Sequence, residues 1–283
     1  MKVISTVAEL RSTIGDLRRQ GRTIGLVPTM GALHAGHLSL IEKARTDCDI
    51  VVTSIFVNPT QFNNPEDLRT YPRTVEADCA SLEKSGVDFA FIPTVEEMYP
   101  EPDTRQFNLG PVAEVMEGPM RPGHFNGVAQ VVSKLFSFVN PHKAYFGEKD
   151  YQQIAVIRRM VEIEGFDIEI VACPIVREPD GLAMSSRNVR LTPDQRAIAP
   201  SIHRVLIQSL EQARGQSVAE VESFVTRAIN SIDGLEVEYF TIVDSLSMQP
   251  LTQWADAKSG TAVGCVTVYC GEVRLIDNIT YAL

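Results

Sequence analysis

A chain of 283 residues has room for a sizeable core, either as two domains or as one large α/β unit. Its formal net charge of -10, without any run of basic residues, argues against a protein that grips nucleic acid through the phosphates. Apolar residues make up 44% of the chain, but no apolar run approaches the roughly 20 residues that a membrane-spanning helix needs.

Neither the cysteines nor the first ten residues indicate export. The five cysteines are odd in number, widely scattered and without a CxxC pair, which favours reduced core thiols over a disulfide framework or a zinc site. The opening MKVISTVAEL lacks the basic and apolar blocks of a signal peptide. We therefore expect a cytoplasmic protein without a membrane partner.

Over the first two thirds of the chain, short apolar runs alternate with amphipathic ones. The apolar runs predict buried strands at 23–27, 50–57, 89–92, 144–146 and 168–176. The amphipathic runs predict helices at 38–45, 74–85, 128–138 and 151–164. Strands separated by helices imply right-handed crossovers and a parallel sheet covered on both faces. Residues 1–176 are thus expected to form a doubly wound, Rossmann-like α/β domain.

The remaining residues, 177–283, predict a smaller C-terminal α+β domain that closes over the site. A tight turn, EPDG at 178–181, follows the boundary near Val176. Thr192 to Gln195 forms a capping box that should open a helix through about Arg214, and Ser217 to Glu220 repeats the pattern. Strand-like runs follow at 237–243, 262–268 and 273–276, the last two arranged as a hairpin.

The loop PTMGALHAGH, residues 28–37, follows the first predicted strand of this series. Ligands of parallel sheets bind beyond the carboxyl ends of the strands, and a helix beginning near His37 would point free N–H groups at a phosphate. His34 and His37 can donate to phosphate oxygens, and Gly36 lets a ligand approach the backbone. Two alternatives are a metal site, disfavoured because HAGH lacks the Glu of HExxH, and histidines that merely cap the helix.

Neither a P-loop nor a GxGxxG fingerprint occurs, so other loops must hold a nucleotide. Two further loops offer charged side chains for that purpose. In GEKD, 147–150, Lys149 could neutralise phosphate and Asp150 could accept from a ribose hydroxyl, although an Asp150–Gln153 helix cap explains the same residues. In MSSRN, 184–188, two hydroxyls and Arg187 could wrap a triphosphate, although an ordinary polar linker has this composition too.

Substrate-binding candidates lie in three other loops. Asn58 and Gln61 of NPTQF suit a ligand with hydroxyl or carboxylate groups, or else the motif is only a turn closed by proline. Asp78 could bind Mg²⁺ beside phosphates, but an exposed helix carboxylate is commoner. RPGHFNG, 121–127, contributes one cation, Arg121, and one histidine.

Together these motifs resemble the pantoate–beta-alanine ligase family of the nucleotidylyltransferase superfamily. VPTMGALHAGH, SIFVNPTQF, YPRT, RPGHFNGV, FGEKDYQQ, MSSRN and RLIDN occur in family order over essentially the whole chain. HAGH is similar to the superfamily's His-x-Gly-His signature. MSSR resembles its Lys-Met-Ser-Lys-Ser loop, with Arg187 as the one cation in place of paired lysines.

The resemblance implies two steps in one pocket of a homodimeric enzyme. ATP and (R)-pantoate, with Mg²⁺, would form pantoyl adenylate and pyrophosphate; the amine of beta-alanine would then displace AMP to give pantothenate. In this family His37 is the proton donor, and we expect His34, Lys149 and Mg²⁺ to oppose the growing negative charge. The base that deprotonates the amine is not indicated.

The resemblance also assigns binding residues. Gln61 and Gln153 would bind pantoate, with Asn58 and Arg121 in supporting contacts and Asp78 beside the magnesium ion. The expected ATP-binding residues are Met30, Gly31, Ala32, Leu33, His34, Ala35, Gly36, His37, Gly147, Glu148, Lys149, Asp150, Val176, Met184, Ser185, Ser186 and Arg187.

Two other functions fit the motifs when each is considered singly. One is an adenylyltransferase that acts on a different small acceptor. Such an enzyme would release pyrophosphate, and beta-alanine would not accelerate its reaction. The other is a nucleotide-binding or regulatory module without catalysis, which turnover of ATP to AMP would exclude.

Overall fold

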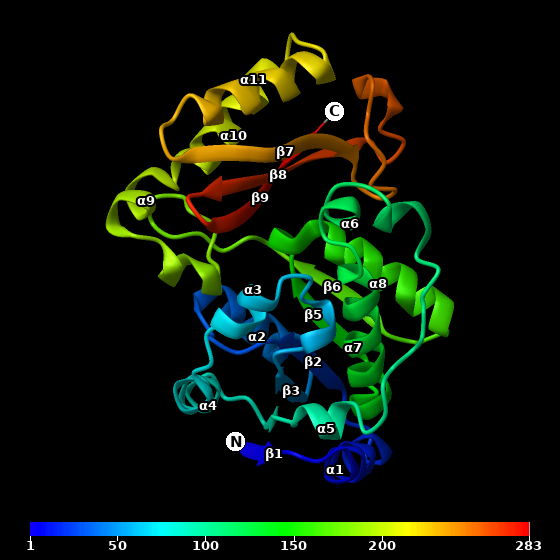
Figure 1. Ribbon diagram of the computed structural model, residues 1–283. Coiled ribbons are helices and arrows are strands. Elements are labelled where there is room, and N and C mark those ends of the chain that lie inside the picture. Colours follow the sequence, from blue (N-terminus) through cyan, green and yellow to red (C-terminus); the bar gives the residue numbers. More distant parts are fainter. Residues whose placement is uncertain (283) are drawn as a thin grey trace. The chain divides into compact units, whose positions relative to one another are not determined.

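A computed structural model describes residues 1–282 (Figure 1). Their contacts divide into two compact units, each described by itself below. The first comprises Met1–Leu109, Met120–Glu148 and Val156–Pro174. The second comprises Gly110–Pro119, Lys149–Ala155 and the chain from Ile175 onward. Nothing in the sequence pattern marks the two short segments that join the second unit.

The first unit is built on a six-stranded parallel sheet in the order β1-β4-β3-β2-β5-β6. Five of its strands are those predicted, which confirms the doubly wound α/β class. The strands are β1 (Lys2–Ile4), β2 (Ile24–Thr29), β3 (Ile50–Ile55), β4 (Phe89–Phe91), β5 (Lys143–Gly147) and β6 (Glu169–Cys173). All six residues of the central β3 are buried, as expected for a parallel strand covered on both faces.

Helices cover both faces of this sheet. On one face Val27 packs in a single cluster with Leu40 and Leu82 from the helices that follow β2 and β3. Leu26, which alternates with Val27, is equally buried on the opposite face, where α7 packs on β2 and against α1. The helices are α1 (Val7–Arg19), α2 (Ala35–Asp47), α3 (Pro65–Thr70), α4 (Val75–Lys84), α5 (Val95–Met98), α7 (His124–Val139) and α8 (Tyr151–Glu164).

The second unit contains an antiparallel sheet of β7 (Leu235–Asp244), β8 (Thr261–Cys270) and β9 (Val273–Ala282), in that order. The predicted hairpin of the last two strands is confirmed, and Gly271 in its turn has φ +58, where glycine is favoured. Both predicted capping boxes are present, with Thr192 opening α9 (Pro193–Ile198) and Ser217 opening α11 (Val218–Asn230).

One helix prediction was wrong. The expected helix from Thr192 to about Arg214 is two helices, because α9 ends at Ile198 and α10 (Ser201–Gln212) begins after Pro200. A proline lacks the N–H that would bond to the preceding turn and its ring crowds the carbonyl there, so the helix restarts instead of continuing.

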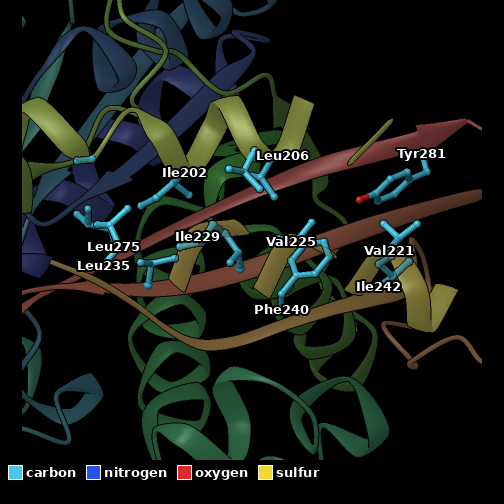
Figure 2. Close-up of a cluster of buried hydrophobic side chains, with 14 of the residues drawn as sticks. Ile202, Leu206, Val221, Val225, Ile229, Leu235, Phe240, Ile242, Leu275 and Tyr281 are labelled. Atoms are coloured by element: carbon cyan, nitrogen blue, oxygen red, sulfur yellow. The ribbon is translucent and has the colours of Figure 1, made fainter. Parts of the chain in front are cut away.

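Alternating side chains on the strands build a core on each face of this small sheet. Val266 and Val268 pack with α10 and α11 in the cluster of Figure 2, together with Phe240 and Leu206. Val263 and Cys265 point the other way and pack with Met116, Val112 and Tyr151. The short segments 110–119 and 149–155 therefore cover the sheet face opposite the helices. The first of them includes all of α6 (Glu117–Met120) except its last residue.

Short 3-10 helices lie in several of the loops. They are η1 (Pro59–Gln61), η2 (Gly110–Ala113), η3 (Glu148–Asp150), η4 (Ser186–Arg190) and η5 (Trp254–Asp256). Among residues 1–282, no helix is both long enough and apolar enough to cross a membrane.

Candidate active site

The HAGH motif forms the first turn of α2. The helix begins at Ala35, two residues before the position expected, and His34 is its N-cap. The Nδ1 of His34 accepts from the Gly36 N–H at 3.2 Å, and the Nδ1 of His37 accepts from the His34 N–H at 3.3 Å. The two imidazoles thus form a capping box, with ring centroids 4.1 Å apart.

This cap decides which nitrogen of each ring carries the proton. A ring nitrogen that accepts a hydrogen bond holds no hydrogen, so the neutral rings of His34 and His37 are protonated at Nε2. An Nε2–H group is the donor that a phosphate oxygen requires. Capping and anion binding, which were alternatives for these histidines, are therefore compatible: the cap uses Nδ1, and the other nitrogen is the donor.

Asp78 holds the loop that precedes α2. Its Oδ2 accepts from the Ala32 N–H at 2.9 Å, and its Oδ1 accepts from the Leu33 N–H at 2.8 Å and from the Thr74 hydroxyl at 3.2 Å. The carboxylate fixes Ala32 at φ 50, a left-handed conformation that is unfavourable for alanine. Gly31, at φ +80, passes so close that a Cβ there would lie 3.0 Å from Asp78 Oδ2.

These bonds bear on the predicted magnesium contact of Asp78. Asp78 is 3% exposed, so it is not the exposed helix carboxylate that was the alternative. Both of its oxygens already accept hydrogen bonds. The arrangement favours an anchor for the loop over a metal ligand. Among residues 1–282, no group of three or more His, Cys, Asp and Glu side chains is placed to hold a metal ion.

Asn58 and Gln61 form one hydrogen-bonded pair beside the same loop. The Nδ2 of Asn58, which is 1% exposed, donates to Gln61 Oε1 at 3.2 Å and to the Gly127 carbonyl at 3.1 Å. Tyr99 donates to Asn58 Oδ1 at 2.8 Å, so both ends of the Asn58 amide are engaged within the protein. With its oxygen turned to Asn58, Gln61 presents Nε2, which lies 3.3 Å from Met30 Sδ.

The RPGHFNG loop supports this pair. Arg121 Nη1 lies 3.1 Å from Nε2 of His124, whose Nδ1 lies 2.8 Å from the Gln61 carbonyl oxygen. Because a guanidinium can only donate, His124 carries its proton on Nδ1 and donates it to that carbonyl. Gly127 lies so close that a Cβ there would be 2.4 Å from the Thr60 carbonyl oxygen. The backbone role of His124 was not predicted, and its only signal was the motif itself.

In the second unit, Lys149 and Ser185 line one small pocket together with Asn188 and Asp277. The Lys149 side chain is 17% exposed, and its ammonium lies 3.5 Å from Asp150 Oδ2. Ser185 caps η4 through the Arg187 N–H at 3.2 Å. The Oδ1 of Asn188 is buried without a hydrogen-bond partner in the part of the chain that the structure describes. Gln153 lies half-buried in the first turn of α8.

The predicted EPDG turn is the tip of a short hairpin that leads into MSSRN. The Met184 N–H donates to the Val176 carbonyl at 3.0 Å, Arg177 and Ala183 form an antiparallel bridge, and Gly181 turns at φ +96. Met184, Ser185, Ser186 and Arg187 therefore follow directly from a structured hairpin, which the linker interpretation of this motif did not anticipate.

The predicted site residues thus fall into two groups. Met30 to His37, Asn58, Gln61, Asp78, Arg121, Gly147 and Glu148 lie in the first unit; Lys149, Asp150, Gln153, Val176 and Met184 to Arg187 lie in the second. The structure brings Met30 beside Gln61 and brings Lys149 beside Ser185. The meeting of the two groups in one pocket stays a prediction.

Comparison with known proteins decides the family. The family model described as pantoate–beta-alanine ligase matches residues 2–280. The chain belongs to the pantoate–beta-alanine ligase family. It is accordingly a ligase of pantothenate biosynthesis, as the motifs indicated.

Relatives within the pantoate–beta-alanine ligase family match over nearly the full length. The pantothenate synthetase of Porphyromonas gingivalis strain W83 is 61% identical over 281 residues, which is 99% of each chain. The crystal structure of pantothenate synthetase from Thermus thermophilus has a TM-score of 0.91 and 48% identity over 99% of each chain. The Francisella tularensis pantoate–beta-alanine ligase, complexed with beta-gamma ATP and beta-alanine, has a TM-score of 0.80 and 36% identity over 99% of this chain and 97% of that one.

Proposed function

We propose that the chain condenses (R)-pantoate with beta-alanine through a pantoyl-adenylate intermediate, with ATP as co-substrate. The observation that carries the proposal is the contact of Gln61 with Met30, at 3.3 Å between Nε2 and Sδ. It puts the donor group of the acid-binding candidate beside the loop that begins the nucleotide-binding motif. An acid and an α-phosphate held there would be neighbours, which is what adenylation requires.

In the first step, a carboxylate oxygen of pantoate attacks the α-phosphorus of ATP. The bond from that phosphorus to the bridging oxygen breaks, and pyrophosphate leaves with the electron pair. Negative charge grows on the phosphate oxygens, and the N–H groups at the start of α2 and the Nε2–H groups of His34 and His37 are suited to oppose it. Lys149 and Arg187 would add positive charge from the second group of residues.

The cap at α2 bears on the proposed proton transfer by His37. A second proton on Nδ1 would point at the His34 N–H, which Nδ1 now accepts at 3.3 Å, and would break the capping box. His37 is therefore better suited to donate a hydrogen bond from Nε2 than to act as an imidazolium acid. In the second step the beta-alanine nitrogen attacks the acyl carbon, loses a proton, and AMP leaves with the bridging oxygen.

Mg²⁺ remains part of the proposal as the counter-ion of the ATP phosphates. Asp78 does not fit the role of a magnesium ligand, because its two oxygens are engaged by the Ala32 and Leu33 N–H groups. Magnesium usually keeps several waters and binds through substrate phosphates with one or two carboxylates. No step is assigned to it. A cytoplasmic homodimer completes the proposal; it rests on the sequence and on the family.

Isotope exchange between pyrophosphate and ATP tests this function. We expect labelled pyrophosphate to enter ATP only when pantoate is present, and to do so without beta-alanine. The reason is that exchange needs only the first step, running forward and then backward. Exchange without pantoate would refute the acid assignment and favour an adenylyltransferase with another acceptor. Exchange that appears only when beta-alanine is present would refute the free adenylate intermediate. As a control for the acceptor, beta-alanine should consume preformed adenylate and release AMP.

A further inference from the structure

The RLIDN motif, residues 274–278, lies on β9 and has no part in the steps above. Its last two residues, Asp277 and Asn278, are 5% and 6% exposed. Because successive residues of a strand point to opposite faces, these two side chains leave the sheet in opposite directions. Asn278 binds a candidate ATP-binding loop directly, and Asp277 binds the hairpin that leads into another.

Asp277 binds the hairpin that leads into Met184 to Arg187. Its Oδ2 accepts from Arg177 Nη1 at 2.7 Å and its Oδ1 accepts from Nη2 at 2.9 Å, a bidentate pair. Arg177 Nη1 also donates to the Gly181 carbonyl at 3.2 Å, so one guanidinium joins the base of the hairpin, its turn and β9. The position of Ser185 is thereby tied to the sheet.

Asn278 binds the other segment. Its Nδ2 donates to the Lys149 carbonyl oxygen at 3.2 Å, which ties the GEKD loop to the same strand. Asp277 itself lines the pocket that Lys149 and Ser185 share. Adjacent residues of one rigid strand therefore fix two loops that contribute a cation and a hydroxyl to a common pocket.

A stabilising role alone does not explain the Asp277–Arg177 pair well. The side chains are 5% and 19% exposed, and removing two such charges from water costs about as much as their attraction returns. Buried ion pairs of this kind add little net stability compared with apolar residues, whereas their directional hydrogen bonds fix geometry. The pair is therefore better explained by the position that it gives to Ser185.

We propose that Asp277 and Asn278 are positioning residues for ATP, which set the spacing between Lys149 and the Ser185–Arg187 segment. The inference rests on the proposed function of those loops in binding ATP. Neither side chain needs to touch the nucleotide. Their loss should weaken ATP binding and leave pantoate binding, assigned to Gln61 in the first unit, unchanged.

The test compares D277N and N278A with a matched control that removes a different carboxylate partner of the same strand. Glu117 accepts a bidentate pair from Arg274 of β9, at 2.8 and 2.7 Å, and this pair joins neither loop to the strand, so E117Q makes the same carboxylate-to-amide change elsewhere. We expect the KM for ATP to rise about tenfold in D277N and about fivefold in N278A, with KM for pantoate within about twofold. E117Q should lower the melting temperature without raising the KM for ATP.

A double-mutant cycle with K149M separates positioning from general damage. If Asn278 acts through Lys149, N278A should add less than about twofold to the KM for ATP in the K149M background. An unchanged KM for ATP in both D277N and N278A, equal losses for ATP and pantoate, or full additivity with K149M would overturn the inference. If K149M alone leaves the KM for ATP unchanged, the ATP-binding role of Lys149 fails first and the inference falls with it.

Discussion

Replacing Asp78 with asparagine should loosen the loop before α2. The carboxylate offers one oxygen to the Ala32 N–H and the other to the Leu33 N–H and the Thr74 hydroxyl. An amide has one oxygen, so either orientation turns an NH₂ group toward a backbone N–H. The better orientation places NH₂ next to Leu33, because the Thr74 hydroxyl can rotate and accept from it.

The cost of D78N follows from those contacts. One buried N–H loses its acceptor, which costs about 1–3 kcal/mol, and the remaining bond loses its charge, which costs roughly 1 kcal/mol more. About 1 kcal/mol of this returns if Ala32, at φ 50, relaxes out of its left-handed conformation. A net loss of about 1–3 kcal/mol for the folded loop corresponds to at most roughly a 5- to 150-fold rise in the KM for ATP, a limit that applies when the nucleotide binds only the ordered loop and the wild-type loop is marginally ordered.

Thermal unfolding and ATP titration, each at low and high magnesium, measure the effect. We expect the KM for ATP to rise in D78N and excess Mg²⁺ to give no recovery, because the loop and not a metal ligand is lost. D88N is the control, because Asp88 Oδ2 accepts from the Val51 N–H at 2.8 Å at the start of β3. Weakening this bond should lower the melting temperature without changing the KM for ATP. Full recovery of D78N by magnesium, with an unchanged melting temperature, would refute this reasoning and restore Asp78 as a metal ligand.

Three further changes test other parts of the site. H37A removes the Nε2–H donor together with one bond of the capping box and should leave the fold intact, so adenylation should slow by ~2–4 kcal/mol, measured by pyrophosphate exchange; normal exchange would show that this ring is a bystander. G127A places a Cβ 2.4 Å from the Thr60 carbonyl and should raise the KM for pantoate, whereas G215A, with nothing within 4 Å, should not; equal effects would exclude a local cause. Burial, and then the nearby Arg177, lower the pKa of His203 below its ordinary 6.5, so the unfolded chain binds the proton more readily. The stability from neutral His203 is therefore present above about pH 6.5 and lost as pH falls below it, and H203Q should flatten the decline of unfolding free energy between about pH 7 and about pH 5; an unchanged slope would contradict this.

Patterns that repeat over a few residues determined much of this protein from the sequence alone. Strand and helix periodicity in the first two thirds gave the parallel α/β class, and the capping boxes at Thr192 and Ser217 were visible as local motifs. The break at Pro200 was also available, since a proline inside a predicted helix is a stop signal. The three-residue β1 was missed because a strand as short as Lys2–Ile4 carries too little alternation to be recognised. The helix α1 was missed although its signals were local, with Thr6 as N-cap and Leu10 and Ile14 on one face.

The candidate site divides along the same line. His34, Gly36 and His37 were identified from their spacing, because a strand, a glycine loop and a helix start follow one another in the chain. The role of Asp78 in holding the loop was not predicted, because its partners Ala32 and Leu33 lie 46 and 45 residues away in the chain. The order of the strands decides that they meet. Arg177 and Asp277 are 100 residues apart.

The physical reason is the range of the interactions involved. Backbone geometry and side-chain period act over one or two turns, so the sequence by itself indicates where most of the helices and strands lie and which loops join them. Which buried carboxylate finds which guanidinium or N–H group depends on strand order, register and the closing of long loops. Only the tertiary structure decided that Asp78 holds a loop, that Asn58 orients Gln61, and that Asp277 and Asn278 join two loops to one strand.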